Sequence, residues 1–393
     1  MDGAVIDRDT IIKAYFLLGF SNKEIRILLA YEYGIVVSER TMKRITSKNG
    51  LYRRKHYSDV LDIAVYICEL CKSSSCQHGY RWMYRELRKA GFNTNQETVR
   101  ILLGVVDPDG VNSRKRRRLR RRQYRSKGPN SVWHIDGYDK LKPYGICIHG
   151  CIDGFSRNVL WAEAWSTNND PTVTAGYFIE TVKRLDGCPE RIRSDEGTEN
   201  RVIEQLQYLL RLEHVDEFAA KNSFLYGSST LNQRIESWWG ILRKQCLDYW
   251  IQHFKNLKDD GYFSGDFLDK NLVIFCYLDA IQKEINDMVE NWNYHKIRPS
   301  KNSECPHGRP IIMYAMPDLY QVEDHLKPIA NNALRLCESE CTFKGDSACD
   351  KTIREICGIL MTEFAWEFPP LNSQLCDLYL NLRREIKSEL LLQ

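Results

Sequence analysis

The stretch "VWHIDGYDKL", residues 132–141, places an acidic side chain, Asp136, where apolar and polar residues alternate. Alternation with a period of two predicts a β-strand that buries one face. Two further β-rich stretches follow, "YGICIHGCID" (144–153) and "RNVLWAEAWS" (157–166), and turn-forming residues occur at "KPYG" and "GFSRN". We therefore predict a sheet that begins with three antiparallel strands and carries Asp136 on the first of them.

Helices and strands alternate after these three strands. "DPTVTAGYFIETVKRLDG" (170–187) predicts a helix with Asp170 as its N-cap and Pro171 at its first position. We predict a strand at "ERIR" (190–193), a helix at "VIEQLQYLLRL" (202–212), a strand at "HVDEFAA" (214–220) and a helix over "STLNQRIESWWGILRKQCL" (229–247). This order of elements indicates an α+β or mixed-sheet domain.

Three carboxylates lie at the ends of these elements or inside them. Asp136 lies on the first strand, Asp195 just after "ERIR", and Glu236 inside the last helix. A site for two divalent cations, Mg²⁺ or Mn²⁺, needs acidic oxygens that converge from separate rigid elements. Any one of these acids alone is more often a surface residue, so the metal site is predicted from the combination.

The composition narrows the class of protein. None of the 393 residues lies in a stretch apolar and long enough to cross a membrane, and no secretory signal is visible, so we expect an intracellular protein. Its 14 cysteines are then interpreted as reduced thiols. This interpretation includes two clusters without a standard zinc spacing: Cys68, Cys71, Cys76 with His78, and Cys337, Cys341, Cys349 with Cys357.

The net charge of +4 is divided unevenly along the chain. Residues 1–130 hold 27 Lys and Arg against 13 Asp and Glu, and the remainder is net negative. The first 55 residues predict three short helices. The second begins with a capping box of Ser21 and Glu24 and ends at Gly34, and the third begins at Ser38. A basic last helix is typical of helix-turn-helix domains, and a basic bundle without that role is the alternative.

A second helical unit and a basic linker follow. In residues 56–112 we expect a helix over 94–103 with Thr94 as its cap. The motifs "GYR" and "TVRILL" in this unit resemble the second helix-turn-helix of bacterial insertion-sequence transposases. Ten of the fourteen residues from Arg114 to Lys127 are basic. Such a run is compatible with a solvated tether, a nuclear import signal or an arm that binds phosphates.

Four separated motifs carry a stronger resemblance: "WHIDGYDK", "IDGFSRNVLW", "IRSDEGTEN" and "LNQRIESWWGILRK". Over about residues 131–252 the chain resembles the retroviral-type integrase catalytic core, found in the DDE transposases and integrases of the RNase H-like superfamily. The resemblance implies that Asp136, Asp195 and Glu236 are the catalytic, metal-binding triad. Gly197, Asn200 and Asn232 match further family positions near the site, and Asp153 matches an acidic position that is not a ligand.

The chain also departs from the family pattern. The interval between Asp195 and Glu236 is longer than usual, and "AKNSFLYGSS" (220–229) is the expected place of the extra loop. The zinc module of retroviral integrases is absent from the front, which looks instead like the paired helix-turn-helix front of transposases. These departures favour a eukaryotic-type DNA transposon as the source.

We therefore expect an α/β fold in five parts. An RNase H-like mixed sheet flanked by helices (131–255) is preceded by two all-α helix-turn-helix units (1–55 and 56–112) and a basic linker (113–130), and is followed by a helical C-terminal region (256–393). The implied function is DNA integration or transposition, in which DNA ends are cleaved and a 3′-hydroxyl is joined to target DNA. A domesticated, catalytically silent DNA-binding protein derived from a transposon is the alternative.

The implied partners are double-stranded DNA, as transposon ends and target, and further copies of the chain on that DNA. No membrane or small-molecule substrate is implied, and the nucleus is the expected location. Two basic residues lie seven and eight positions beyond Glu236, about two helical turns along. The expected DNA contacts are Arg40, Lys43, Arg44, Arg116, Arg117, Arg118, Arg120, Arg121, Arg122, Arg243 and Lys244.

Overall fold

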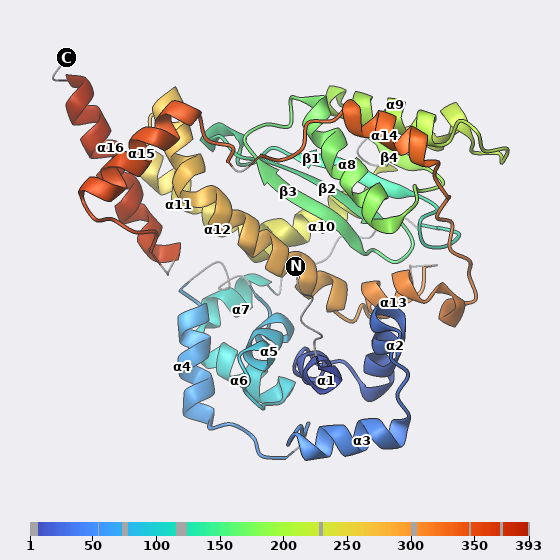
Figure 1. The fold of residues 1–393 in the computed structure, drawn as a ribbon. Coiled ribbons are helices and arrows are strands. Elements are labelled where there is room, and N and C mark those ends of the chain that lie inside the picture. Colours follow the sequence, from blue (N-terminus) through green and yellow to red (C-terminus); the bar gives the residue numbers. More distant parts are fainter. Residues whose placement is uncertain are drawn as a thin grey trace. The chain divides into compact units, whose positions relative to one another are not determined.

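The chain forms two compact units, residues 1–122 and 123–393 (Figure 1). The computed structural model describes residues 7–53, 55–72, 78–114, 124–227, 231–299, 305–345, 347–369 and 372–391. Among these residues no helix is both long and apolar enough to span a membrane. The five-part division expected from the sequence stays a prediction at its finer boundaries.

The first unit begins with three helices, α1 (Arg8–Leu17), α2 (Asn22–Tyr33) and α3 (Glu39–Lys48). The expected capping box is present, because Ser21 accepts from the backbone N–H of Glu24 while the Glu24 side chain accepts from that of Ser21. Gly34 ends α2 in the left-handed conformation that glycine adopts without strain. Buried apolar residues such as Ile12, Leu28 and Met42 hold the helices together.

Four more helices complete the unit: α4 (Val60–Leu70), α5 (Tyr80–Lys89), α6 (Gln96–Val106) and α7 (Pro108–Arg114). Ile67, Leu87 and Val99 lie in the core that α4, α5 and α6 share. The expected cap of α6 was wrong by one residue. Asn95 accepts from the backbone N–H of Thr98 at 2.8 Å, whereas Thr94 is buried. Asparagine is the stronger N-cap, and it decides where the helix begins.

The second unit is built on a five-stranded mixed sheet in the order β3-β2-β1-β4-β5 (Figure 1). The strands are β1 (Trp133–Tyr138), β2 (Cys147–Asp153), β3 (Val159–Trp165), β4 (Ile192–Ser194) and β5 (Phe224–Tyr226). The first three are antiparallel, as expected, and β4 and β5 run parallel to β1. The fold is therefore the expected RNase H-like mixed sheet.

Helices cover the two faces of this sheet. Alternate residues of β1 point to opposite faces, and Trp133 and Ile135 enter a core shared with α8 (Pro171–Leu185) and α9 (Arg201–Leu210). Asp170 caps α8 by accepting from the backbone N–H of Thr172, as expected. α10 (Gln233–Leu242) contacts β1 and β2 and places Trp239 against Tyr138 on the other face.

Side-chain amides cover the outer edge of the sheet at β3. Gln282, on the long helix α12 (Phe267–Tyr294), accepts from the backbone N–H of Ala164 at 2.7 Å and donates to the carbonyl of Ala162 at 3.0 Å. Asn293, further along α12, makes the same two kinds of bond with Val159 at 2.8 and 3.0 Å. The helix thus satisfies an edge strand that would otherwise invite pairing with another chain.

The expected strand at residues 214–220 is wrong, because the last strand is β5, inside the stretch expected to be a loop. Arg211 is fully buried, and its guanidinium donates to both carboxylate oxygens of Asp216 at 2.7 Å. Asp216 also accepts from the backbone N–H of Phe218. The chain therefore turns around the buried arginine before it pairs with β4.

The remainder of the chain is helical. α11 (Asp248–Asp259) precedes α12, and α13 (Pro310–Ala315), α14 (Asn331–Ser339), α15 (Lys351–Glu363) and α16 (Leu375–Leu391) follow it. α16 is held on α12 through Arg383, which donates to the fully buried carboxylate of Asp269 at 2.7 Å. α14 packs beside α8 and α9, with Cys337 in the shared core. The C-terminal helices are thus part of the second unit.

We predict that Gln282→Leu destabilises the protein by about 1–3 kcal/mol, because it leaves a half-buried N–H and a half-buried C=O of β3 without partners. The midpoint of urea unfolding measures the change. Lys283→Leu introduces the same side chain at an exposed position of the same helix and is the matched control. Equal effects of the two variants would contradict the role assigned to the Gln282 amide.

Candidate active site

Strand register brings the first two acidic residues together. β1 and β4 are parallel, with Trp133 opposite Ile192 and His134 opposite Arg193. Asp136 lies three residues after Trp133 on β1. Asp195 lies three residues after Ile192, the residue opposite Trp133. The carboxyl ends of parallel neighbours meet at one edge of a sheet, which is where α/β folds place ligands. Both carboxylates therefore lie at that edge.

The third acid comes from α10, on the sheet face that Asp136 shares. Glu236 lies on the first turn of this helix and is exposed, whereas Asp136 is only 8% exposed. The charges of Asp195 and Glu236 both act on Asp136, and that of Asp195 acts on Glu236. All three carboxylates predicted from the sequence thus converge closely enough to repel one another.

Burial and repulsion change the acidity of the site. Burial raises the pKa of the Asp136 carboxyl to about 8, the hydrogen bond from Trp239 opposes this shift, and the charges of Asp195 and Glu236 add to it. Burial, followed by the charge of Asp195, also raises the pKa of Glu236. A cation bound among these groups would remove the repulsion.

The donor chemistry fits a hard divalent cation, since Mg²⁺ and Mn²⁺ prefer carboxylate oxygens. In the described part of the chain, however, no group of three or more His, Cys, Asp or Glu side chains is already arranged to hold a metal ion. One oxygen of Asp136 is instead engaged by the indole of Trp239 at 2.7 Å. Asp136, Asp195 and Glu236 are the residues that would hold the ion.

Two side chains attach α10 to β1. Asn232, the residue before the helix, donates from Nδ2 to the carbonyl oxygen of Ile135 at 2.8 Å. Trp239 donates from Nε1 to Oδ2 of Asp136 at 2.7 Å. The two bonds reach consecutive residues of β1 and lie on either side of Glu236 along the helix. The position of Glu236 relative to Asp136 therefore depends on them.

A buried chain of hydrogen bonds extends this attachment to Tyr124. Because the Asn232 amide donates to Ile135, its Oδ1 accepts from Nδ1 of His134 at 2.7 Å. Nε2 of His134 then accepts from the Tyr124 hydroxyl at 2.6 Å. Burial lowers the pKa of His134 to about 3, so the ring is neutral and this tautomer is fixed. Tyr124, in the last part of the basic linker, is thereby anchored beside the acidic site.

Three further residues that match family positions, Gly197, Asn200 and Asp153, make hydrogen bonds within the protein. Asn200 is buried and bonded to His149 at 3.2 Å, and the Gly197 N–H donates to Asp195 Oδ1 at 3.3 Å. Asp153, left out of the ligand set, is buried and caps a turn by accepting from Ser156 and Asn130. Burial raises its pKa to about 6.

Sequence reasoning missed Glu199, which is half-buried near Asp195. Burial raises its pKa, and the charges of Asp195 and Asp139 add to the shift. The spacing of Glu199 from Asp195 within "DEGTEN" is the only signal that could have pointed to it. The bond from Trp239 to Asp136 was also missed, because only the fold shows that this indole reaches β1.

The expected DNA contacts lie in three places. Arg40, Lys43 and Arg44 are exposed on α3, where Lys43 pairs with Glu39 at 2.8 Å. The six arginines expected in the linker, Arg116, Arg117, Arg118, Arg120, Arg121 and Arg122, lie outside the described residues.

Arg243 and Lys244 are also exposed, but they lie in a π-helical turn, η6 (Arg243–Leu247), rather than on a continuing α-helix. A π-turn changes the face that each residue presents, so the spacing argument made from the sequence does not apply to them. Arg243 donates to Asp248 at 2.8 Å. π-Turns within helices are frequent at functional sites.

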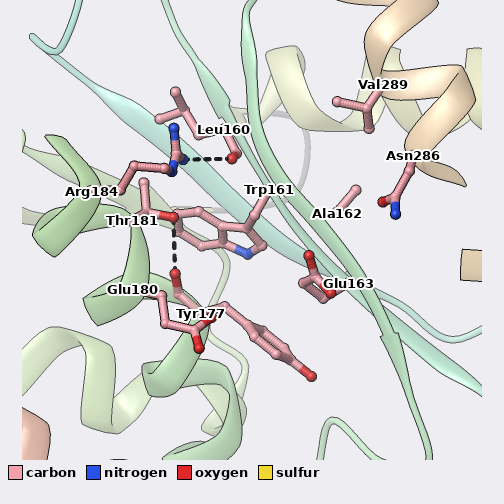
Figure 2. A pocket seen from close by; sticks show the side chains of 10 residues that line it. All are labelled: Leu160, Trp161, Ala162, Glu163, Tyr177, Glu180, Thr181, Arg184, Asn286 and Val289. Carbon is pink, nitrogen blue, oxygen red and sulfur yellow. Dashed lines mark hydrogen bonds between the residues drawn. The ribbon is translucent and has the colours of Figure 1, made fainter. Parts of the chain in front are cut away.

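A pocket of about 360 Å³ lies beside the edge strand β3, between β3, α8 and α12 (Figure 2). Arg184, on α8, crosses toward β3 and donates to the carbonyl of Leu160 at 3.0 Å. The charged side chains around the pocket are Glu163, Glu180 and Arg184. None of the three converging carboxylates lines it, so it is separate from the candidate active site.

The cysteines among the described residues form no disulfide. Cys76 lies outside the described residues, and the groups around His78 and Cys337 provide no metal cluster among those that are described.

The sheet order, the flanking helices and the three converging acids define an RNase H-like core, and residues 123–314 match the family model described as an integrase core domain. This match confirms, over residues 123–314, the resemblance to an integrase core that was found in the sequence. No curated protein matches the chain.

We predict that Asp136→Asn increases thermal stability over the wild type by a margin that grows from pH 5 to pH 9. The folded pKa of about 8 exceeds the ordinary value of 3.8, so the stabilisation linked to the protonated carboxyl is full below about pH 4 and is lost as the pH rises through about 8. The variant keeps a neutral side chain throughout. Melting temperatures in metal-free buffer measure the margin.

Glu196→Gln removes one charge from an exposed position next to Asp195 and controls for net charge. A margin for Asp136→Asn that does not change with pH would contradict the buried, proton-retaining carboxyl.

Proposed function

We propose that this protein is a DDE-type integrase or transposase that cleaves DNA ends and joins a 3′-hydroxyl to target DNA. One observation carries the proposal. Carboxylates from β1, from the loop after β4 and from α10 converge at the carboxyl edge of the sheet within an integrase core domain. The cost of placing mutually repelling acids together is understandable if a cation is their ligand.

The chemistry follows from these groups. Asp136, Asp195 and Glu236 would hold Mg²⁺ or Mn²⁺, two ions per site, and these ions would supply the Lewis acidity and charge neutralisation needed for phosphodiester displacement. The buried end of the site, at Asp136, limits access of water, while the exposed Glu236 faces the solvent from which DNA approaches. Water as the nucleophile gives end cleavage, and a DNA 3′-hydroxyl gives strand transfer.

DNA recognition is assigned to the first unit and the linker. Arg40, Lys43 and Arg44 present three exposed cations on α3, a geometry that suits the major groove and its phosphates. The basic linker and the pair Arg243 and Lys244 add further phosphate contacts. Two DNA ends must be held together for integration, so the active form is an oligomer on DNA, and its place of action is the nucleus.

We predict that wild-type protein nicks labelled duplex DNA and joins it to a target in Mg²⁺ or Mn²⁺, and that Glu236→Gln and Asp195→Asn abolish both products while DNA binding persists. Glu196→Gln is the matched control and keeps activity, because its side chain is exposed and outside the triad. Gel analysis of the labelled strands measures the result.

Tight, salt-sensitive DNA binding without cleavage in either metal would contradict the enzymatic proposal. It would support the alternative, a catalytically silent DNA-binding protein.

For DNA binding, we predict that changing Arg40 and Arg44 together to Ala weakens duplex binding and lowers the slope of log affinity against log salt by about 2, since each phosphate contact contributes about 0.9. Fluorescence anisotropy at several salt concentrations gives both quantities. The matched control changes Lys13 and Lys23 together to Ala, which removes the same charge from exposed positions on α1 and α2. Equal losses in the two variants would show that net charge, rather than α3, governs binding.

A further inference from the structure

Trp239 occupies an unusual position for a large aromatic residue. Its ring is buried against Tyr138 and Trp238, with ring centroids 5.3 and 4.9 Å away, and its indole N–H donates to Asp136 Oδ2 at 2.7 Å. The neighbouring Trp238 is equally buried, but its indole N–H has no hydrogen-bond partner. Two adjacent tryptophans thus differ in one polar contact, which only Trp239 makes with the acidic site.

The sheet leaves space for this contact at Gly150. Gly150 pairs with Asp136 across β1 and β2, so it lies beside the carboxylate. A Cβ at this position would lie 2.7 Å from Cη2 and 3.3 Å from Cζ2 of Trp239. Such a distance is too short for two carbon atoms, so the indole would have to move. Glycine at 150 is therefore required for Trp239 to reach Asp136.

Trp239 and Asn232 act together on the position of α10. They are seven residues apart, two turns along the same helix face, and both bond to β1. Glu236 lies four residues after Asn232 and three before Trp239, so it lies between the two attachments on that face. Two fixed points set both the rotation of the helix and its height along the strand. The distance from Glu236 to Asp136 is set in this way.

We propose that Trp239 is a positioning residue of the acidic site: its indole N–H holds Oδ2 of Asp136 and so leaves Oδ1 available to a divalent cation, in register with Asp195 and Glu236. This inference rests on the proposed function, because it assigns a role in metal binding. Carboxylate ligands are commonly oriented by such outer hydrogen bonds, whose loss costs about 10–100-fold in metal affinity or activity. Trp239 itself touches neither the metal nor the DNA in this assignment.

The test compares Trp239→Phe with Trp238→Phe in the full-length protein. Both changes remove an indole N–H from a buried ring on the same helix, but only the first removes a hydrogen bond. We expect Trp239→Phe to weaken Mn²⁺ binding in calorimetry about 10–100-fold and to raise the Mn²⁺ concentration needed for strand transfer by a similar factor. Trp238→Phe should leave both values near those of the wild type.

Gly150→Ala provides an independent route to the same state. On its own it should displace the indole and reproduce the loss seen in Trp239→Phe. Phenylalanine lacks the atoms that the new Cβ would meet, so Gly150→Ala should add little loss in the Trp239→Phe background. This non-additivity identifies the indole as the cause. Additive losses would overturn the proposal, because Gly150 would then act by another route.

A spectroscopic signal reads the contact without catalysis. In ¹⁵N-labelled protein the Trp239 indole N–H resonance is assigned by its absence from Trp239→Phe, and Mg²⁺ should shift it more than that of Trp238. Equal behaviour of the two phenylalanine variants, or tighter Mn²⁺ binding by Trp239→Phe, would overturn the positioning role while wild-type activity stands. Failure of the wild type to bind metal and to join DNA would overturn the proposed function, and the positioning role with it.

Discussion

A carboxylate on the central strand of a buried sheet is the constraint on which the second unit depends. Asp136 is 8% exposed and lies on β1, the strand between β2 and β4, where it pairs with Gly150 of β2. Burial of a charge in such a place is costly unless hydrogen bonds or a cation compensate it. The protein supplies hydrogen bonds from the Trp239 indole and from the backbone of Gly137, and it places two more acids nearby. The proposed metal ion would supply the remaining compensation.

The elements around Asp136 follow from this requirement. β4 is parallel to β1, so Asp195 lies at the same edge of the sheet as Asp136. Because Gly150 on β2 has no side chain, the Trp239 ring can lie against the strand at that position. Asn232 uses its amide twice, once on the backbone of β1 and once on a neutral His134, which in turn accepts from Tyr124. The end of the basic stretch is thereby fixed beside the acids through side chains that never carry charge there.

Much of this arrangement could be predicted from the sequence, because period-two alternation, capping residues and motif order are local signals. The three antiparallel strands and the Asp170 cap follow from such signals, whereas the choice of the three acids as one triad came from the resemblance of the four motifs to the integrase core. The sequence does not reveal that residues 214–220 form a turn rather than a strand, because this turn depends on the ion pair between the buried Arg211 and Asp216. The Trp239 bond, the amide cover of β3 by Gln282 and the π-turn at Arg243 also depend on tertiary contacts between residues distant in the chain.

The most direct measurement of the central claim is the position of Mn²⁺ in crystals of the full-length protein, located by its anomalous scattering. We predict a peak within coordination distance of Asp136 Oδ1 and Asp195, near Glu236, with the bond from the Trp239 indole to Oδ2 intact. No peak at saturating Mn²⁺, or a peak only at other acidic residues, would contradict the claim that these three carboxylates form a metal-dependent active site.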